Sequence, residues 1–195
     1  MAKQCTTEKS LERQTRIGLA LEKMMLEQDY EDIFVSDLCD RAGISRRSFY
    51  RYFSGKDDVL RAILEEIIRD CHLHAVFKYC PDRNLQDRLA DFFLYWMEKQ
   101  VHWLEILARN HQESLLIDMY LDWSRKEYLE GRAMGEEERN LISVSLEFAS
   151  TGLMMTLFRW ARTGFRQSPG EMAGYLAKVM TRPIYNSVWE KASQL

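Results

Sequence analysis

One short window of the chain gathers side chains that bind phosphates and base edges. Residues 41–56 contain Arg41, Arg46, Arg47, Arg51 and Lys56, five cations without a single acid. Arginine can bind guanine O6 and N7 with two hydrogen bonds, and serine pairs with several base edges. Tyrosine hydroxyls and lysine can bind phosphates and so fix the register of a protein on a duplex. The chemistry of this window is therefore suited to nucleic acid.

A short helix is needed to present these groups, and the sequence predicts one over 46–53. Ser45 is a good N-cap for it. Phe49 and Phe53 are four residues apart, so they share one side of the helix, with Ile44 as a plausible neighbour. The opposite side carries Arg47, Ser48 and Arg51, flanked by Tyr50 and Tyr52. An aromatic anchor behind and arginines in front suit a helix that enters a major groove.

The flanking segments complete a helix-turn-helix pattern. A short amphipathic helix is expected over 36–42, and Gly43 follows it as a turn residue. After the second helix, Ser54-Gly-Lys-Asp57 is a start signal for a long helix that runs to about Lys78. A basic octamer taken alone is more often a solvated cationic face. The turn, the N-cap and the next helix start all fall at the intervals of a DNA reader.

The segment from Arg16 to Leu64 resembles the N-terminal domain of the tetracycline-repressor (TetR/AcrR) family of bacterial regulators. The resemblance is carried by RIGLALEKMM, Tyr30, VSDLCDRAGISRRSFYRYF, and the Lys56 and Leu60 of SGKDDVL. It implies a three-helix DNA-binding head and a larger helical C-terminal domain that dimerises and often holds an inducer. It also implies residue roles: Arg46, Arg47 and Ser48 read bases, while Tyr50, Tyr52, Lys56 and Ser36 contact phosphates. The family's usual Thr pair before Ser36 is replaced here by Phe34-Val35.

The whole chain is expected to be all-α, with about nine helices. Apolar periodicity and helix signals place them at 9–28, 36–42, 46–53, 57–78, 85–100, 101–111, 115–129, 141–163 and 169–181. Ser168-Pro-Gly-Glu171 is a well-formed start for the last one. We expect a DNA-binding domain over 1–56 and a ligand-binding and dimerisation domain over 57–195.

The last two helices form the dimer interface in the family that the chain resembles. Apolar side chains available for it are Leu146, Phe148, Leu153, Met154, Leu157, Phe158, Tyr175, Leu176 and Val179. A long helix that is apolar on most sides is hard to bury in a domain of this size alone. Packing within the core of one chain is the alternative for each of these residues.

Aromatic residues cluster between about 85 and 130. A pocket for an apolar or aromatic inducer could be lined by Phe92, Tyr95, Trp96, Trp103, Tyr120 and Trp123. The same aromatic stripe is more often ordinary core.

Composition narrows the remaining functions. The formal net charge is −3, which excludes a polycation that coats nucleic acid indiscriminately. The N-terminus lacks an apolar stretch of signal-peptide type, so we expect a cytoplasmic protein. The stretch 142–161 is the most membrane-like, but it contains Glu147 and Arg159. Charges within a membrane span are costly. We therefore expect a helix buried in protein and no membrane contact.

No metal, cofactor or enzymatic site is expected. The four cysteines are scattered without a CxxC pair, which favours reduced thiols. Cys71, His72, His74 and Cys80 match no closed metal motif. The chain has no Gly-rich phosphate loop, HExxH or GxSxG.

The leading hypothesis is a sequence-specific transcriptional regulator that binds a pseudo-palindromic operator as a homodimer. It would act as a repressor that a small-molecule inducer releases from DNA. Two alternatives stay open. One is a helical small-molecule-binding protein whose head does not bind DNA, and the other is a helical enzyme.

Overall fold

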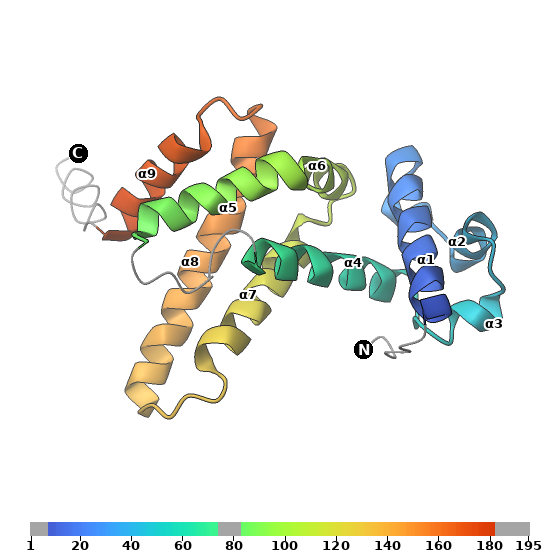
Figure 1. The fold of residues 1–195 in the computed structure, drawn as a ribbon, viewed down its shortest axis with the longest axis horizontal. Helices are drawn as coiled ribbons and strands as arrows, with labels where there is room; N and C mark the ends of the chain where they lie inside the picture. Colours follow the sequence, from blue (N-terminus) through green and yellow to red (C-terminus); the bar gives the residue numbers. More distant parts are fainter. Residues whose placement is uncertain (1–7, 74–82, 182–195) are drawn as a thin grey trace, which may run out of the picture. The chain divides into compact units, whose positions relative to one another are not determined.

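Helices account for all regular structure in the part of the chain that the computed structural model describes, residues 8–73 and 83–181. Nine α-helices and one 3-10 turn lie in these ranges, which contain no strand (Figure 1). They are α1 Glu8–Glu27, η1 Tyr30–Asp32, α2 Val35–Ala42, α3 Arg46–Phe49, α4 Lys56–Cys71, α5 Leu85–Lys99, α6 Val101–Arg109, α7 Glu113–Leu129, α8 Glu136–Arg162 and α9 Pro169–Thr181. The predicted all-α class and helix order are confirmed. The expected end of α4 near Lys78 falls outside the described residues.

Most helix ends follow the predicted chemistry. Gly43 ends α2 with φ 64°, a left-handed conformation that glycine adopts without a steric penalty. At the start of α9, the Ser168 backbone N–H donates to Glu171 Oε2 at 2.8 Å, and the Glu171 N–H donates back to Ser168 Oγ. At the start of α4 the acid that pairs with Ser54 is Asp58 rather than Asp57, which the sequence pattern had suggested.

Helix α3 is shorter than predicted. The expected helix 46–53 ends at Phe49, and residues 50–52 form a turn. The Phe49 carbonyl accepts hydrogen bonds from both the Tyr52 N–H, at 2.9 Å, and the Phe53 N–H, at 3.0 Å. The mixed 3-10 and α spacing tightens the chain after Phe49. Phe53 nevertheless stays on the buried side, as predicted.

The chain divides into two compact units, each made of two stretches of sequence. The first comprises 1–68 and 102–158, and the second 69–101 and 159–195. In the first unit, Ile17, Leu21, Leu38 and Phe49 are buried in the head, by which we mean α1, α2 and α3, and Leu60 of α4 is buried as well. In the second unit α5 and α9 lie side by side (Figure 1). The functional boundary after residue 56 stays a prediction.

Helix α8 is buried along only part of its length. Among the described residues it is the one helix long and apolar enough to span a membrane by length and composition, a property that core helices of soluble proteins share. Only 22% of its most apolar window is buried. Ser150, Leu153, Met154, Leu157 and Phe158 are buried, whereas the side chains nearer its start are exposed or half-buried. Within the chain itself, the expected burial of this helix in protein is therefore seen only for its second half.

Candidate nucleic-acid interface

The start of α3 is built by the turn before it. The Gly43 N–H donates to the carbonyls of Asp40 and Cys39, and the Ile44 N–H donates to Cys39 O at 3.0 Å. These bonds end α2, and the chain then continues through Ser45, which has an extended backbone conformation. The Ser45 hydroxyl oxygen accepts a hydrogen bond from the Ser48 N–H at 3.2 Å. The predicted N-cap is therefore present, and Arg46 is the first helical residue.

The buried side of α3 is aromatic, as predicted. Phe49 and Phe53 are both buried, and their ring centroids are 5.8 Å apart. The Phe49 ring also meets Tyr50 edge-on at 5.4 Å. Phe49 is the only large apolar side chain of this four-residue helix, and it is buried, so the polar side chains of the helix are the ones available to solvent.

Arginine side chains dominate the exposed side of α3 and the turn after it. Arg46, Arg47, Tyr50 and Arg51 are exposed, and Ser48 is half-buried. Exposed guanidinium groups can bind guanine edges or phosphates. The arrangement has the chemistry that a major-groove reader needs.

Tyr52 is buried within the protein, although its position in the sequence suggested a phosphate contact. It is 3% exposed, and its hydroxyl oxygen accepts a hydrogen bond from Arg51 Nη2 at 2.7 Å. The Arg51 guanidinium lies 5.0 Å from the centroid of the Tyr52 ring. Hydrogen bonds with Arg13 and, more weakly, with Arg51 and Ser10 lower the pKa of the Tyr52 phenol, against the opposing effect of burial. Tyr52 thus orients Arg51 in this structure.

Lys56 also makes its present contacts within the protein. Its ammonium donates to the carbonyls of Tyr30 at 2.6 Å and Glu31 at 3.1 Å, and it lies 4.5 Å from the centroid of the Tyr30 ring. The Tyr30 hydroxyl donates to Asp57 Oδ1 at 2.6 Å. Burial, and next this hydrogen bond, raise the pKa of Tyr30 far above its ordinary range. Lys56 and Asp57 therefore hold η1 against the start of α4.

The start of α2 departs from the family's usual pattern in the way the sequence indicated. Phe34 occupies the N-cap position and provides no side-chain cap. Ser36 is half-buried in the first turn, and its hydroxyl donates to Asp37 Oδ1 at 3.3 Å. Its predicted phosphate contact stays a prediction.

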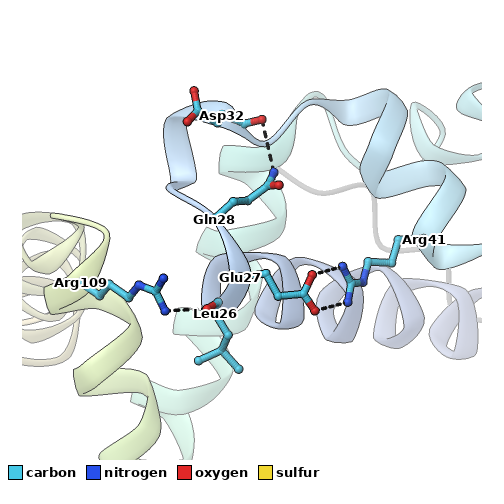
Figure 2. Close-up of polar contacts among 6 residues, drawn as sticks. All are labelled: Leu26, Glu27, Gln28, Asp32, Arg41 and Arg109. Carbon is cyan, nitrogen blue, oxygen red and sulfur yellow. Dashed lines mark hydrogen bonds and ion pairs between the residues drawn. The ribbon is translucent and has the colours of Figure 1, made fainter.

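Arg41 is engaged in holding two helices together. Figure 2 shows its guanidinium facing the Glu27 carboxylate with two hydrogen bonds, which join α2 to the end of α1. The hydrogen bond to Arg41 lowers the pKa of Glu27. Figure 2 also shows Arg109 Nη1 donating to the Leu26 carbonyl, at 2.5 Å, and the Gln28 side chain donating to Asp32 O. The end of α1 thus receives contacts from both α2 and α6.

A buried asparagine next to Arg109 completes this corner, and sequence reasoning missed it. The Asn110 Nδ2 group donates to Met25 O at 3.0 Å and to Ile106 O at 2.8 Å, while its Oδ1 accepts from the Tyr30 N–H at 2.8 Å. The next residue, His111, has φ 55°, which is unfavourable for a side chain with a Cβ. No sequence motif marks Asn110, because its partners lie about 80 residues away.

The aromatic residues predicted to line a pocket are divided between the two units. Phe92, Tyr95 and Trp96 belong to the second unit, and Trp103, Tyr120 and Trp123 belong to the first. A hollow of about 560 Å³ in the second unit is lined by Tyr95 and by the charged or polar groups Asp70, Arg83, Asp91, Glu98, Lys99 and Gln100, with Leu94. A hollow of about 270 Å³ in the first unit lies between α1 and α4 and includes Trp103. The inducer site stays a prediction.

The residues predicted for a dimer interface divide into two groups. Leu153, Met154, Leu157 and Phe158 are buried within their own chain, and Leu146 is half-buried. Tyr175 and Val179 on α9 are exposed. The exposed large apolar side chains of α8 are Phe148, which is among the predicted residues, and Leu141, Val144 and Met155. Their spacing of three, four and seven residues places them on one face.

The candidate metal and thiol groups have ordinary surroundings where they are described. Burial raises the pKa of the Cys71 thiol, and burial likewise raises that of Cys39, so both are poor nucleophiles. Residues 8–73 and 83–181 contain no group of three His, Cys, Asp or Glu side chains that could hold a metal ion. His74 and Cys80 lie outside these ranges.

Comparison with known proteins finds a family domain in the N-terminal part of the chain. Residues 20–63 match the family model described as bacterial regulatory proteins, tetR family. The HTH-type transcriptional repressor ComR of Escherichia coli is 28% identical over 72 residues, 36% of this chain and 34% of that protein. The HTH-type transcriptional regulator EthR of Mycobacterium tuberculosis is 34% identical over 62 residues, 32% of this chain and 29% of that protein. The chain thus matches about a third of the length of these curated relatives.

The fold is shared over a longer stretch. A crystal structure of a TetR transcriptional regulator from Streptococcus agalactiae aligns with 89% of this chain and 96% of that chain, at a TM-score of 0.56 and 18% identity. The family model covers α2, α3 and the turn between them, together with the C-terminal part of α1 and the first half of α4. Residues 20–63, which include this helix-turn-helix, thus match the domain of the tetR family of bacterial regulatory proteins.

Proposed function

We propose that this protein is a sequence-specific, DNA-binding transcriptional regulator of the cytoplasm that acts as a homodimeric repressor and is released by a small-molecule inducer. The observation that carries the proposal is the exposed arginine pair, Arg46 and Arg47, at the capped start of α3. Phe49 anchors this helix from behind, so the arginines are presented on a fixed backbone. A rigid element with exposed guanidinium groups is what base readout requires.

The apolar face of α8 supports the homodimer. Leu141, Val144, Phe148 and Met155 expose large side chains on one face of a long helix. Exposed apolar stripes of this kind usually mark an interaction surface. A twofold dimer would bury the same stripe from both copies and would present two heads to a pseudo-palindromic operator.

The corner at Asn110 supports control of the head by an inducer. Asn110 and Arg109 connect the end of α6 to the end of α1 and to η1. Lys56 and Asp57 connect the same η1 turn to α4. A ligand that binds one arrangement of α6 and α7 better than another would act on the head through these bonds. Its effect is limited to that difference in affinity.

The repressor role is supported by the family and by one relative, since ComR is named a transcriptional repressor. The inducer's chemistry is left open by the structure. The larger hollow is lined mainly by charged and polar groups, whereas the sequence favoured an aromatic pocket.

The deciding experiment is selection of bound duplexes from a random-sequence DNA library at stated salt concentrations, repeated with the Arg47→Ala variant. We expect the parent to select a pseudo-palindrome. The variant should lose about 1–3 kcal/mol of binding free energy and relax the base preference at one position in each half-site, because one bidentate contact is removed. Lys126→Ala, which removes an exposed cation from α7, is the control and should bind as the parent does. A parent that selects no sequence would instead favour a helical small-molecule-binding protein with an inactive head.

A further inference from the structure

Arg16, on α1 and outside the basic window, binds the turn of the helix-turn-helix. Its Nη2 atom donates to the Ala42 carbonyl at 2.5 Å and to the Gly43 carbonyl at 3.3 Å. These carbonyls lie at the end of α2, where helix dipoles place partial negative charge. Arg16, on α1, therefore caps the end of α2 although it precedes Ala42 by 26 residues in the sequence.

Gly43 and Arg16 fit together in a way that excludes a larger side chain. A Cβ atom built on Gly43 would lie 2.8 Å from Arg16 Nη2, closer than carbon and nitrogen approach in proteins. Arg16 could move aside, since it is the end of a flexible side chain, but it would then lose its bonds to the two carbonyls. The left-handed φ of 64° at Gly43 is a second, separate objection to most substitutions.

The turn also fixes the position of the start of α3, because Ile44 is the only residue between Gly43 and the N-cap Ser45. A helix of four residues has little stability of its own, so its direction depends on what holds its ends. Phe49 holds one side of it, and the turn holds its beginning. The side chain that holds the turn to α1 is Arg16.

We propose that Arg16 is a positioning residue for DNA recognition, which aims the start of α3 through the turn and does not itself bind a phosphate. The proposal rests on the DNA-binding function proposed above. It assigns a role in recognition to a residue on α1, whereas sequence reasoning placed base and phosphate contacts only between Ser36 and Lys56.

The interlock is tested without DNA by a double-mutant cycle in urea unfolding. The variants are Arg16→Ala, Gly43→Asn and the pair, with Lys23→Ala as a control that removes a cation from the same helix. Asparagine tolerates the left-handed conformation, so Gly43→Asn isolates the contact with Arg16. We expect Gly43→Asn to lower the folding equilibrium constant about two- to tenfold more in the parent than in the Arg16→Ala background, because only the parent has these hydrogen bonds to lose. Equal losses in the two backgrounds would overturn the interlock.

The recognition role is tested on the selected operator with fully folded variants. We expect Arg16→Ala to lower the ratio of specific to non-specific affinity about tenfold, comparable to one mismatched base pair. The salt dependence of binding should keep its slope, and Arg16→Lys should recover part of the ratio. A slope reduced by about one would make Arg16 a phosphate contact, and an unchanged ratio would leave it without a role in recognition; either result overturns the proposal. If the parent itself selects no sequence, the proposed function fails, and the unfolding cycle still decides whether Arg16 holds the turn.

Discussion

At the scale of single residues, the cations of the basic window perform two different tasks. Arg46 and Arg47 are exposed at the start of α3. Arg41 instead pairs with Glu27, and Lys56 binds carbonyls of η1. Arg46 and Arg47 thus belong to the proposed binding surface, whereas Arg41 and Lys56 make contacts within the protein. The number of positive charges in the window 41–56 is therefore larger than the number of groups available for the proposed DNA contacts.

Among the residues that join the helices of this corner, Asn110 is the one whose replacement should lower the free energy of unfolding most. Asn110→Ala would leave the Tyr30 N–H and the Met25 carbonyl buried without their partner. We expect the free energy of unfolding to fall by roughly 2–4 kcal/mol, since each unpaired buried group costs about 1–3 kcal/mol. Urea unfolding measures this, and Asn140→Ala, at an exposed position of α8, is the matched control. Equal stability of the two variants would show that the buried bonds contribute nothing net.

The residue roles that could be predicted from the sequence are those set by near neighbours. The Ser45 cap, the Gly43 turn and the Phe49–Phe53 pair depend on spacings of a few residues, and all three are present. The contacts of Asn110, Arg16 and Arg109 join segments 26 or more residues apart. Nothing in local periodicity encodes which side chains tertiary packing brings together, so these contacts could not be foreseen.

At the scale of helices, the apolar pattern located each element but misjudged several ends. Helix α8 begins at Glu136, whereas apolar periodicity suggested a start near Leu141. Three glutamates fill its first turn, where negative charge is favoured by the helix dipole. Polar first turns carry no apolar signal, which explains the difference. At α3 the opposite occurred, because a tight turn continues the aromatic spacing beyond the helix end.

The start of α9 should respond to acid. Hydrogen bonds from the Ser168 N–H and hydroxyl lower the pKa of Glu171 below its ordinary value of 4.5. A group whose pKa is lowered by folding stabilises the folded state above its unfolded pKa and loses that effect as pH falls through the folded pKa. We therefore expect amide exchange at the start of α9 to increase, relative to the rest of the helix, as pH falls below about 4.5.

Glu171→Gln provides the control for this acid effect. Glutamine can accept the same backbone hydrogen bond but does not titrate, so exchange at the start of α9 should lose its pH dependence relative to the rest of the helix. An equal acid response in both proteins would assign the effect to another group.

At the scale of the whole molecule, the exposed face of α8 sets the expected assembly. The side chain of Phe148 is 63% exposed, and three further large apolar groups lie on the same face. Such a face is poorly suited to permanent contact with water. A second copy of the chain would cover it with an identical face.

Phe148→Glu should separate the dimer without unfolding the chain. The position is exposed, so a glutamate should hardly change the free energy of unfolding of the single chain. In the dimer, the glutamates of both copies would be buried in the interface. We expect the dimer dissociation constant to rise about 100-fold or more, the equivalent of about 1.5–3 kcal/mol for each buried phenylalanine. Sedimentation velocity measures the change. Phe34→Glu has the same 63% exposure in the head and should leave the assembly intact. A parent that sediments as a monomer would refute the dimer directly.

The first unit consists of two separate stretches of sequence, and this affects how the head can be transferred to another protein. Tyr30 takes its amide partner from Asn110, and Leu26 takes a guanidinium from Arg109, although residues 69–101 belong to the other unit. A gene fragment cut after residue 68 would therefore encode the proposed DNA-binding surface but would lack these two contacts from Asn110 and Arg109. Chimaeric regulators made by joining this head to a foreign effector domain need a recipient whose own helices supply an equivalent amide and guanidinium at that corner.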